Sequence, residues 1–73
     1  MYKQINKLDQ IQQFQLFCLE SYRNSKGITG MDALQDFKQT GVFGFLSSGY
    51  EILHSKGKKY LTSLIIDYIK RRK

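Results

Sequence analysis

The sequence contains one cysteine, one histidine, no proline and no tryptophan. One cysteine cannot form a disulfide within the chain, and with the histidine it cannot supply the protein ligands of a structural zinc site. His54 has no Cys, Ser or carboxylate at a spacing typical of catalysis, and we expect a structural or capping role for it. Cys18 lies in an apolar helical stripe, where a thiol behaves as a small hydrophobic group. We therefore expect no enzyme activity, no metal site and no cofactor.

Long hydrophobic runs are also absent. Uninterrupted apolar stretches reach only four residues, as in 16–19, whereas a membrane-spanning helix needs about 20. The N-terminus lacks the apolar region and the small-residue cleavage site of a secretory signal, so the expected location is the cytoplasm, where a lone thiol stays reduced. We expect no membrane partner.

The chain has 73 residues, which leaves room for a single domain with one modest core. We predict one domain over 1–73, with 1–7 as an N-terminal extension and 70–73 as a basic tail. A hydrophobic fraction of 41% without proline indicates a folded chain. Because so short a chain is marginally stable and has no disulfide, self-association remains as a candidate source of added stability.

Net positive charge is confined to one end of the chain. Residues 56–73 carry seven basic side chains and one acid, Asp67, whereas the first 55 residues have five basic and five acidic side chains. Any ionic attraction to a phosphate polymer or an acidic partner therefore comes from this end. Asp32 and Asp36 share one face of a predicted helix, and we expect that face to be a solvated acidic surface.

Hydrophobic periodicity predicts an all-α fold, a compact bundle of three to four short helices. The first helix is expected over Leu8–Asn24, where apolar residues fall on one side of a 3.6-residue wheel and glutamines fill most of the other. Thr29 followed by Asp32 resembles a capping box, so a second helix should begin there and end before Gly41. This second helix is expected to bury Met31, Ala33, Leu34 and Phe37.

The stretch 42–54 has two possible interpretations. We favour one bent helix with an apolar face and Gly49 near its centre. The alternative begins the third helix near Gly49, with Ser48 as N-cap and Glu51 as its capping-box partner, and leaves the preceding residues irregular or extended. A last helix follows the basic loop 55–59 and runs into the basic tail. Its apolar face comprises Tyr60, Leu61, Leu64, Ile65, Tyr68 and Ile69.

Two large hydrophobic side chains fall on polar faces of the predicted helices. Phe17 projects opposite the apolar stripe of the first helix, beside Gln13, and Ile66 lies between polar residues of the last helix. Either the fold covers such a side chain or the side chain anchors another protein. We therefore predict Phe17, Ile66 and Gln13 as protein-interface residues, with another protein or a second copy as the partner.

The alternative function is nucleic-acid binding, with helix-turn-helix geometry between the second and third helices. Its candidate residues are Lys56, Lys58, Lys59, Lys70, Arg71, Arg72 and Lys73. The two clusters flank the last helix, about 18 Å apart at helical rise. Gly57 between lysines could admit a phosphate, but the spacing of a P-loop is missing, because Ile52 stands at its first glycine and Lys59 at its hydroxyl residue.

A set of residues spread over about 11–69 carries a resemblance, and its members are Phe14, Phe17, Cys18, Glu20, Tyr22, Gly30, Ala33, Phe37, Gly41, Val42, Tyr50, Leu53, His54, Gly57, Tyr60, Leu61, Ile66, Asp67, Tyr68 and Ile69. Through these residues the sequence resembles a family of small bacterial proteins of unassigned function. Similar proteins are often encoded beside ADP-ribosyltransferase-like toxin proteins, so the resemblance implies an accessory or antitoxin-like role with a toxin-like partner. The pattern is distributed along the chain rather than gathered into a catalytic signature.

Overall fold

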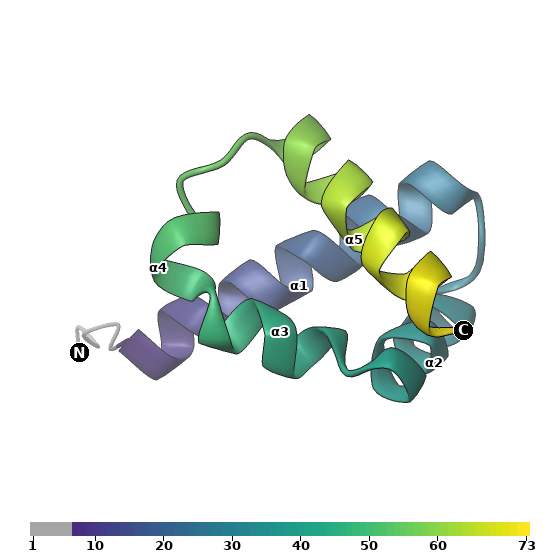
Figure 1. Ribbon diagram of the computed structural model, residues 1–73, viewed down its shortest axis with the longest axis horizontal. Helices are drawn as coiled ribbons and strands as arrows, with labels where there is room; N and C mark the ends of the chain where they lie inside the picture. Colours follow the sequence, from purple (N-terminus) through teal and green to yellow (C-terminus); the bar gives the residue numbers. More distant parts are fainter. Residues whose placement is uncertain (1–6) are drawn as a thin grey trace, which may run out of the picture.

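The computed structural model describes residues 7–73, and over this range every element of regular secondary structure is a helix (Figure 1). This confirms the predicted all-α class, with five helices in place of three or four. The predicted N-terminal extension lies outside the described residues except at Lys7, where the first helix begins. The helices are α1 (Lys7–Lys26), α2 (Gly30–Thr40), α3 (Val42–Ser48), α4 (Tyr50–Leu53) and α5 (Lys58–Arg72).

Local signals in the sequence set both ends of α2. Thr29 is the N-cap, and its hydroxyl oxygen accepts a hydrogen bond of 3.0 Å from the backbone N–H of Asp32. Gly41 has a left-handed φ of 77° and donates its N–H to the carbonyl of Phe37. This one glycine is also the whole connection between α2 and α3. A residue with a Cβ is strained in that conformation, so Gly41 fixes the turn that separates the two helices.

Replacing Gly41 with Ala is expected to lower the free energy of unfolding by about 1–2 kcal/mol, because the left-handed backbone conformation disfavours a Cβ. Gly44→Ala is the matched control, since Gly44 lies inside α3 and a Cβ there meets no atom within 4 Å. Alanine favours a helix interior over glycine, so this control should raise stability by about 0.5–1 kcal/mol. Urea unfolding followed by circular dichroism measures both changes, and equal signs would contradict the prediction.

The stretch 42–54 is helical but interrupted at Gly49. The favoured prediction of one bent helix is wrong in part, because two helices, α3 and α4, occupy this stretch. The alternative is wrong in leaving 42–46 irregular or extended, because α3 covers these residues. Ser48 is not the N-cap of α4, because Gly49 takes that position without a side-chain hydrogen bond. A Cβ on Gly49 would lie 2.9 Å from Cδ1 of Leu53, so the glycine permits this side chain to pack closely against the break.

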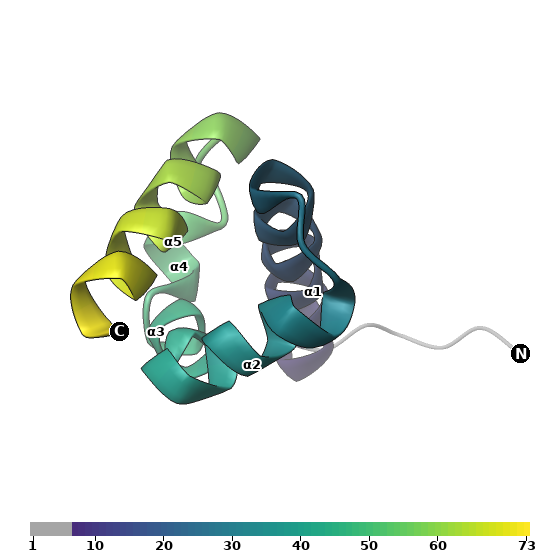
Figure 2. The same cartoon turned by 90° about the vertical axis from the view of Figure 1, so that its right-hand side faces the viewer.

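The core lies between α1, α2 and α5, with α3 closing one side. Figure 1 shows α5 crossing α1, and Figure 2 shows α2 running across one end of the pair. Met31, expected in the core, is 72% exposed in the first turn of α2 and is a correction to the predicted core. The buried hydrophobic residues are Cys18, Tyr22, Ala33, Phe37, Val42, Leu46, Leu53, Leu61, Ile65 and Ile69.

Candidate functional site

The outer face of α1 exposes large hydrophobic side chains. Leu16 is 58% exposed and Phe17 is 44% exposed, whereas Cys18 is fully buried. Successive residues of a helix are rotated by about 100°, so Cys18 points into the core while Leu16 points almost directly away from it. Gln13 is exposed one turn before these two residues, on the same surface. The fold thus leaves Phe17 and Gln13 accessible, as an interface residue must be.

This outer face carries no charge over three turns of helix. Every residue from Gln10 to Leu19 is uncharged, although 25% of the chain is charged. Charged residues are depleted and aromatic residues enriched at the centres of protein interfaces. We refer below to the exposed residues Gln10, Gln12, Gln13, Leu16 and Phe17 as the α1 surface.

Ile66 lies elsewhere. It is half-buried, packs against the core and lines two hollows, one on each side of its position on α5. Phe17 lines neither hollow. The structure therefore does not combine Phe17 and Ile66 in one of these hollows, and Ile66 forms part of a wall rather than projecting as an anchor.

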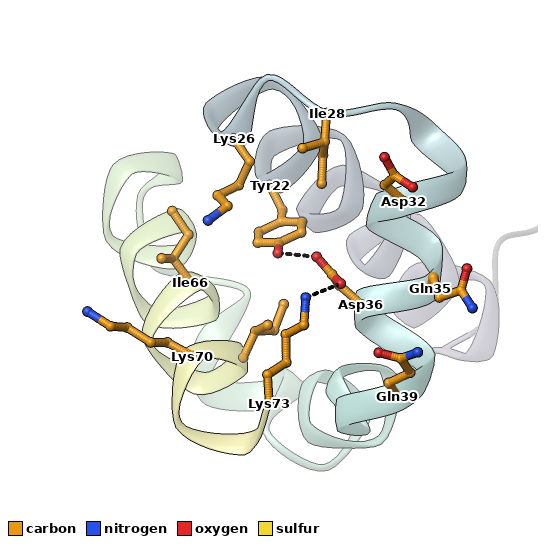
Figure 3. Close-up of a pocket in the computed structure, with 11 residues that line it drawn as sticks. Tyr22, Lys26, Ile28, Asp32, Gln35, Asp36, Gln39, Ile66, Lys70 and Lys73 are labelled. Carbon is orange, nitrogen blue, oxygen red and sulfur yellow. Dashed lines mark hydrogen bonds and ion pairs between the residues drawn. The ribbon is translucent and has the colours of Figure 1, made fainter.

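The larger hollow, of about 780 Å³, is enclosed by the end of α1, by α2 and by α5 (Figure 3). A chain of hydrogen bonds crosses it. The hydroxyl of Tyr22 donates to Oδ2 of Asp36 at 2.6 Å, and Nζ of Lys73 donates to Oδ1 of the same carboxylate at 2.8 Å. The Asp36 side chain is only 15% exposed. The expected solvated acidic surface is therefore wrong for Asp36, although Asp32 is exposed.

These contacts fix the charge state of the cluster. Hydrogen bonds from Lys73 and from Tyr22 lower the pKa of the Asp36 carboxyl. Burial and the bond to Asp36 raise the pKa of the Tyr22 hydroxyl above its usual range. The carboxylate thus stays ionised and the phenol protonated at neutral pH, so the cluster holds helices together rather than exchanging protons.

The seven basic side chains of residues 56–73 lie at the two ends of α5. Three of the four at its C-terminal end contact groups of the chain itself. Nε of Arg71 lies 3.0 Å from the Asp67 carboxylate, the guanidinium of Arg72 lies 3.8 Å from the centre of the Tyr68 ring, and Lys73 pairs with Asp36. Lys70 borders the hollow of Figure 3. Lys56, Lys58 and Lys59 surround the start of the helix, and all three are exposed.

The helix-turn-helix alternative needs a reading helix after α2. The sequence of α3 is Val-Phe-Gly-Phe-Leu-Ser-Ser, with Val42 and Leu46 buried. Base edges are read chiefly by Arg, Asn, Gln and Lys, and α3 contains none of these residues. One residue, Gly41, separates α2 from α3, whereas the turn of this motif has three or four. Among its side chains, α3 offers only the hydroxyls of Ser47 and Ser48 for hydrogen bonds to base edges.

Cys18 and His54, which were considered for catalysis, both have surroundings that suit a structural role. Cys18 is fully buried, and burial raises the pKa of its thiol to about 11. Nδ1 of His54 lies 2.7 Å from the carbonyl oxygen of Tyr50, and the two rings stack at 4.6 Å. His54 is also the C-cap of α4, in agreement with the expected capping role. Among the described residues, no helix is both long and apolar enough to cross a membrane.

Sequence reasoning missed Leu16 and the Tyr22–Asp36–Lys73 cluster. Leu16 stands one turn after Gln12 and Gln13 and one turn before Glu20, and that polar surrounding was the available signal. No comparable signal existed for the cluster, because Asp36 and Lys73 are 37 residues apart and meet only in the folded chain.

The fold defines a small all-α domain. Residues 13–72 match the family described as "Protein of unknown function (DUF3791)", and the chain belongs to that family. The match covers α2 to α5 completely and begins within α1, before Phe17. No curated protein and no solved structure matches the chain significantly.

Proposed function

We propose that this protein is a protein-binding module that uses the α1 surface, and that it acts as an accessory or antitoxin-like partner of a bacterial enzyme or toxin. The observation that supports this most strongly is the exposure of Leu16 and Phe17 on an uncharged helix face. The resemblance to proteins encoded beside ADP-ribosyltransferase-like toxins is the reason for proposing a toxin-like partner.

Three contacts at the C-terminal end of α5 favour this function over nucleic-acid binding. A binding face for a phosphate polymer needs unpaired cations along one surface. Arg71, Arg72 and Lys73 are instead engaged with Asp67, Tyr68 and Asp36 of the same chain. The α1 surface has neither cations to attract a nucleic acid nor acids to repel it, and its aromatic centre suits a hydrophobic pocket on another protein.

Capture of the partner tests this proposal. Tagged wild-type protein is compared with Leu16→Glu in extracts of the native cell, with mass spectrometry of the retained proteins. We expect a specific partner on the wild type and its loss on the variant, because the new carboxylate would be desolvated in the interface. Leu16 is exposed, so the variant should retain its helical circular dichroism.

Met31→Glu is the matched control, since Met31 is even more exposed and lies on α2. It introduces the same charge on a different surface and should retain the partner. Equal loss with both variants, or a partner that stays bound to Leu16→Glu, would contradict the use of the α1 surface.

A further inference from the structure

Opposite charges flank the α1 surface at its two ends. Asp9 lies seven residues before Leu16, in the first turn of α1, and Arg23 lies seven residues after it, in the last turn. Seven residues make nearly two turns of helix, so all three side chains fall on the outer face of α1. Along this face an acid is followed by an uncharged centre and then by a base.

Such a pattern complements itself when one of two helices is reversed. A two-fold axis at Leu16 sets two α1 helices antiparallel, with Asp9 of each copy opposite Arg23 of the other. The same symmetry places Leu16 against its own equivalent and Gln12 opposite Glu20. Two-fold contacts between copies need a surface that matches itself in this way.

The polar groups around Leu16 have the chemistry for these contacts. Nη2 of Arg23 donates to Oε1 of Glu20 at 3.0 Å, and these side chains are 36% and 53% exposed. A guanidinium has five N–H donors, so Arg23 can keep this pair and also bind Asp9 of a second copy. The exposed amide of Gln12 can donate to the Glu20 carboxylate of that copy. The charges at the edge of the contact are thus matched rather than opposed.

The net charge of the chain also favours this face for contact between copies. Each copy has a formal charge of +6, and seven of its basic side chains lie at the two ends of α5. Figure 2 shows α5 and α1 on opposite sides of the molecule. Contact through the outer face of α1 keeps the two α5 helices more than ~20 Å apart, since packed helices lie about 8–10 Å apart. Ionic repulsion is screened over ~8 Å at physiological salt and opposes this arrangement little.

We propose that two copies of this chain pair antiparallel through the α1 surface, with Leu16 at the two-fold axis, and that the pairing masks this surface until the partner displaces one copy. The masking rests on the proposed function. One helix from each copy buries less than the ~1,600 Å² of a standard stable interface, so the pairing is reversible and a partner can compete with it.

Sedimentation equilibrium of the full chain tests the pairing at concentrations from about 10 μM to about 1 mM. We expect the mean mass to rise from that of one chain toward that of two. Leu16→Glu should raise the dissociation constant at least about tenfold, because two carboxylates would meet at the axis. Met31→Glu places the same charge on α2 and should leave the constant unchanged. A wild-type chain that stays monomeric at the highest concentration, or equal weakening by both variants, would overturn the proposal.

Two further measurements test the arrangement of the copies. Leu16→Cys should be linked into a covalent dimer by mild oxidation much faster than Met31→Cys, whereas the native Cys18 is fully buried and does not compete. Asp9→Arg should weaken pairing several-fold, and adding Arg23→Asp in the same chain should restore it, because the exchanged charges again meet. Equal cross-linking of the two cysteine variants, or no restoration by the double variant, would overturn the antiparallel arrangement.

The pairing and the proposed function fail separately. A chain that stays monomeric but still captures a partner through Leu16 would overturn the pairing and reserve the α1 surface for the other protein. A chain that dimerises through Leu16 and captures no partner would support the pairing and contradict the proposed function. With both in place, excess purified partner should convert the dimer into a complex that contains one copy of this chain.

Discussion

Phe17→Ser is expected to reduce affinity for the partner by a factor of about 30 to 1,000 while the protein keeps its fold. Phe17 is 44% exposed and lies on the α1 surface, where an aromatic side chain can fill a pocket of another protein. Truncation of such an anchor removes about 2–4 kcal/mol of binding free energy, which corresponds to a factor of roughly 30 to 1,000. Isothermal titration with the purified partner measures the change.

The matched control for this variant is Tyr60→Ser. Tyr60 is also an exposed aromatic residue, but it lies at the start of α5, where the ammonium of Lys56 is 5.7 Å from the centre of its ring. Its replacement should leave the affinity within a factor of two or three. If Phe17→Ser unfolds the protein in a thermal scan, Phe17 belongs to the core and the binding role assigned to it is wrong.

Asp36→Asn is expected to lower the free energy of unfolding by about 1–3 kcal/mol, a large part of the stability of so small a domain. The carboxylate charge of Asp36 pairs with Lys73 and strengthens the hydrogen bond that Tyr22 donates, and the variant loses this charge. The two contacts join α2 to α1 and to the residue that follows α5. Asp67→Asn is the control, because its pair with Arg71 is exposed and should contribute less than about 1 kcal/mol. Urea unfolding at pH 7 compares the two.

The contribution of Asp36 should also depend on pH. Since its pKa is lower in the folded chain than in the unfolded one, the unfolded state binds more protons in acid. The stabilisation is therefore complete above the unfolded pKa of about 4 and is lost as the pH falls through the folded pKa. The stability difference between wild type and Asp36→Asn should accordingly shrink below pH 4. A constant difference down to pH 2 would mean that the ionised carboxylate is not the source.

The sequence predicted those features that depend on neighbouring residues. The helical period placed Cys18 inside and Phe17 outside, because residues one position apart differ by a fixed rotation. Thr29 and Gly41 marked the ends of α2 through capping chemistry, which is local to the chain. The Lys/Arg residues at the two ends of the last helix likewise followed directly from their positions.

Features that depend on tertiary packing were beyond this reasoning. Met31 fits the apolar period of α2, but it lies in the first turn of the helix and is exposed. Asp36 was predicted to be a surface acid, because no sequence pattern indicates that Tyr22 and Lys73 contact it in the folded chain. The break at Gly49 depends on how closely Leu53 packs there, which periodicity does not encode.

The packing of α5 on α1 has a consequence for the protein during its synthesis. These two helices stand at opposite ends of the described chain and form the most extensive contact between helices. The ribosome must therefore synthesise α5 before the part of the apolar face of α1 that α5 covers can be buried. Until then the face of α1 that α5 covers remains open to chaperones and to unwanted association.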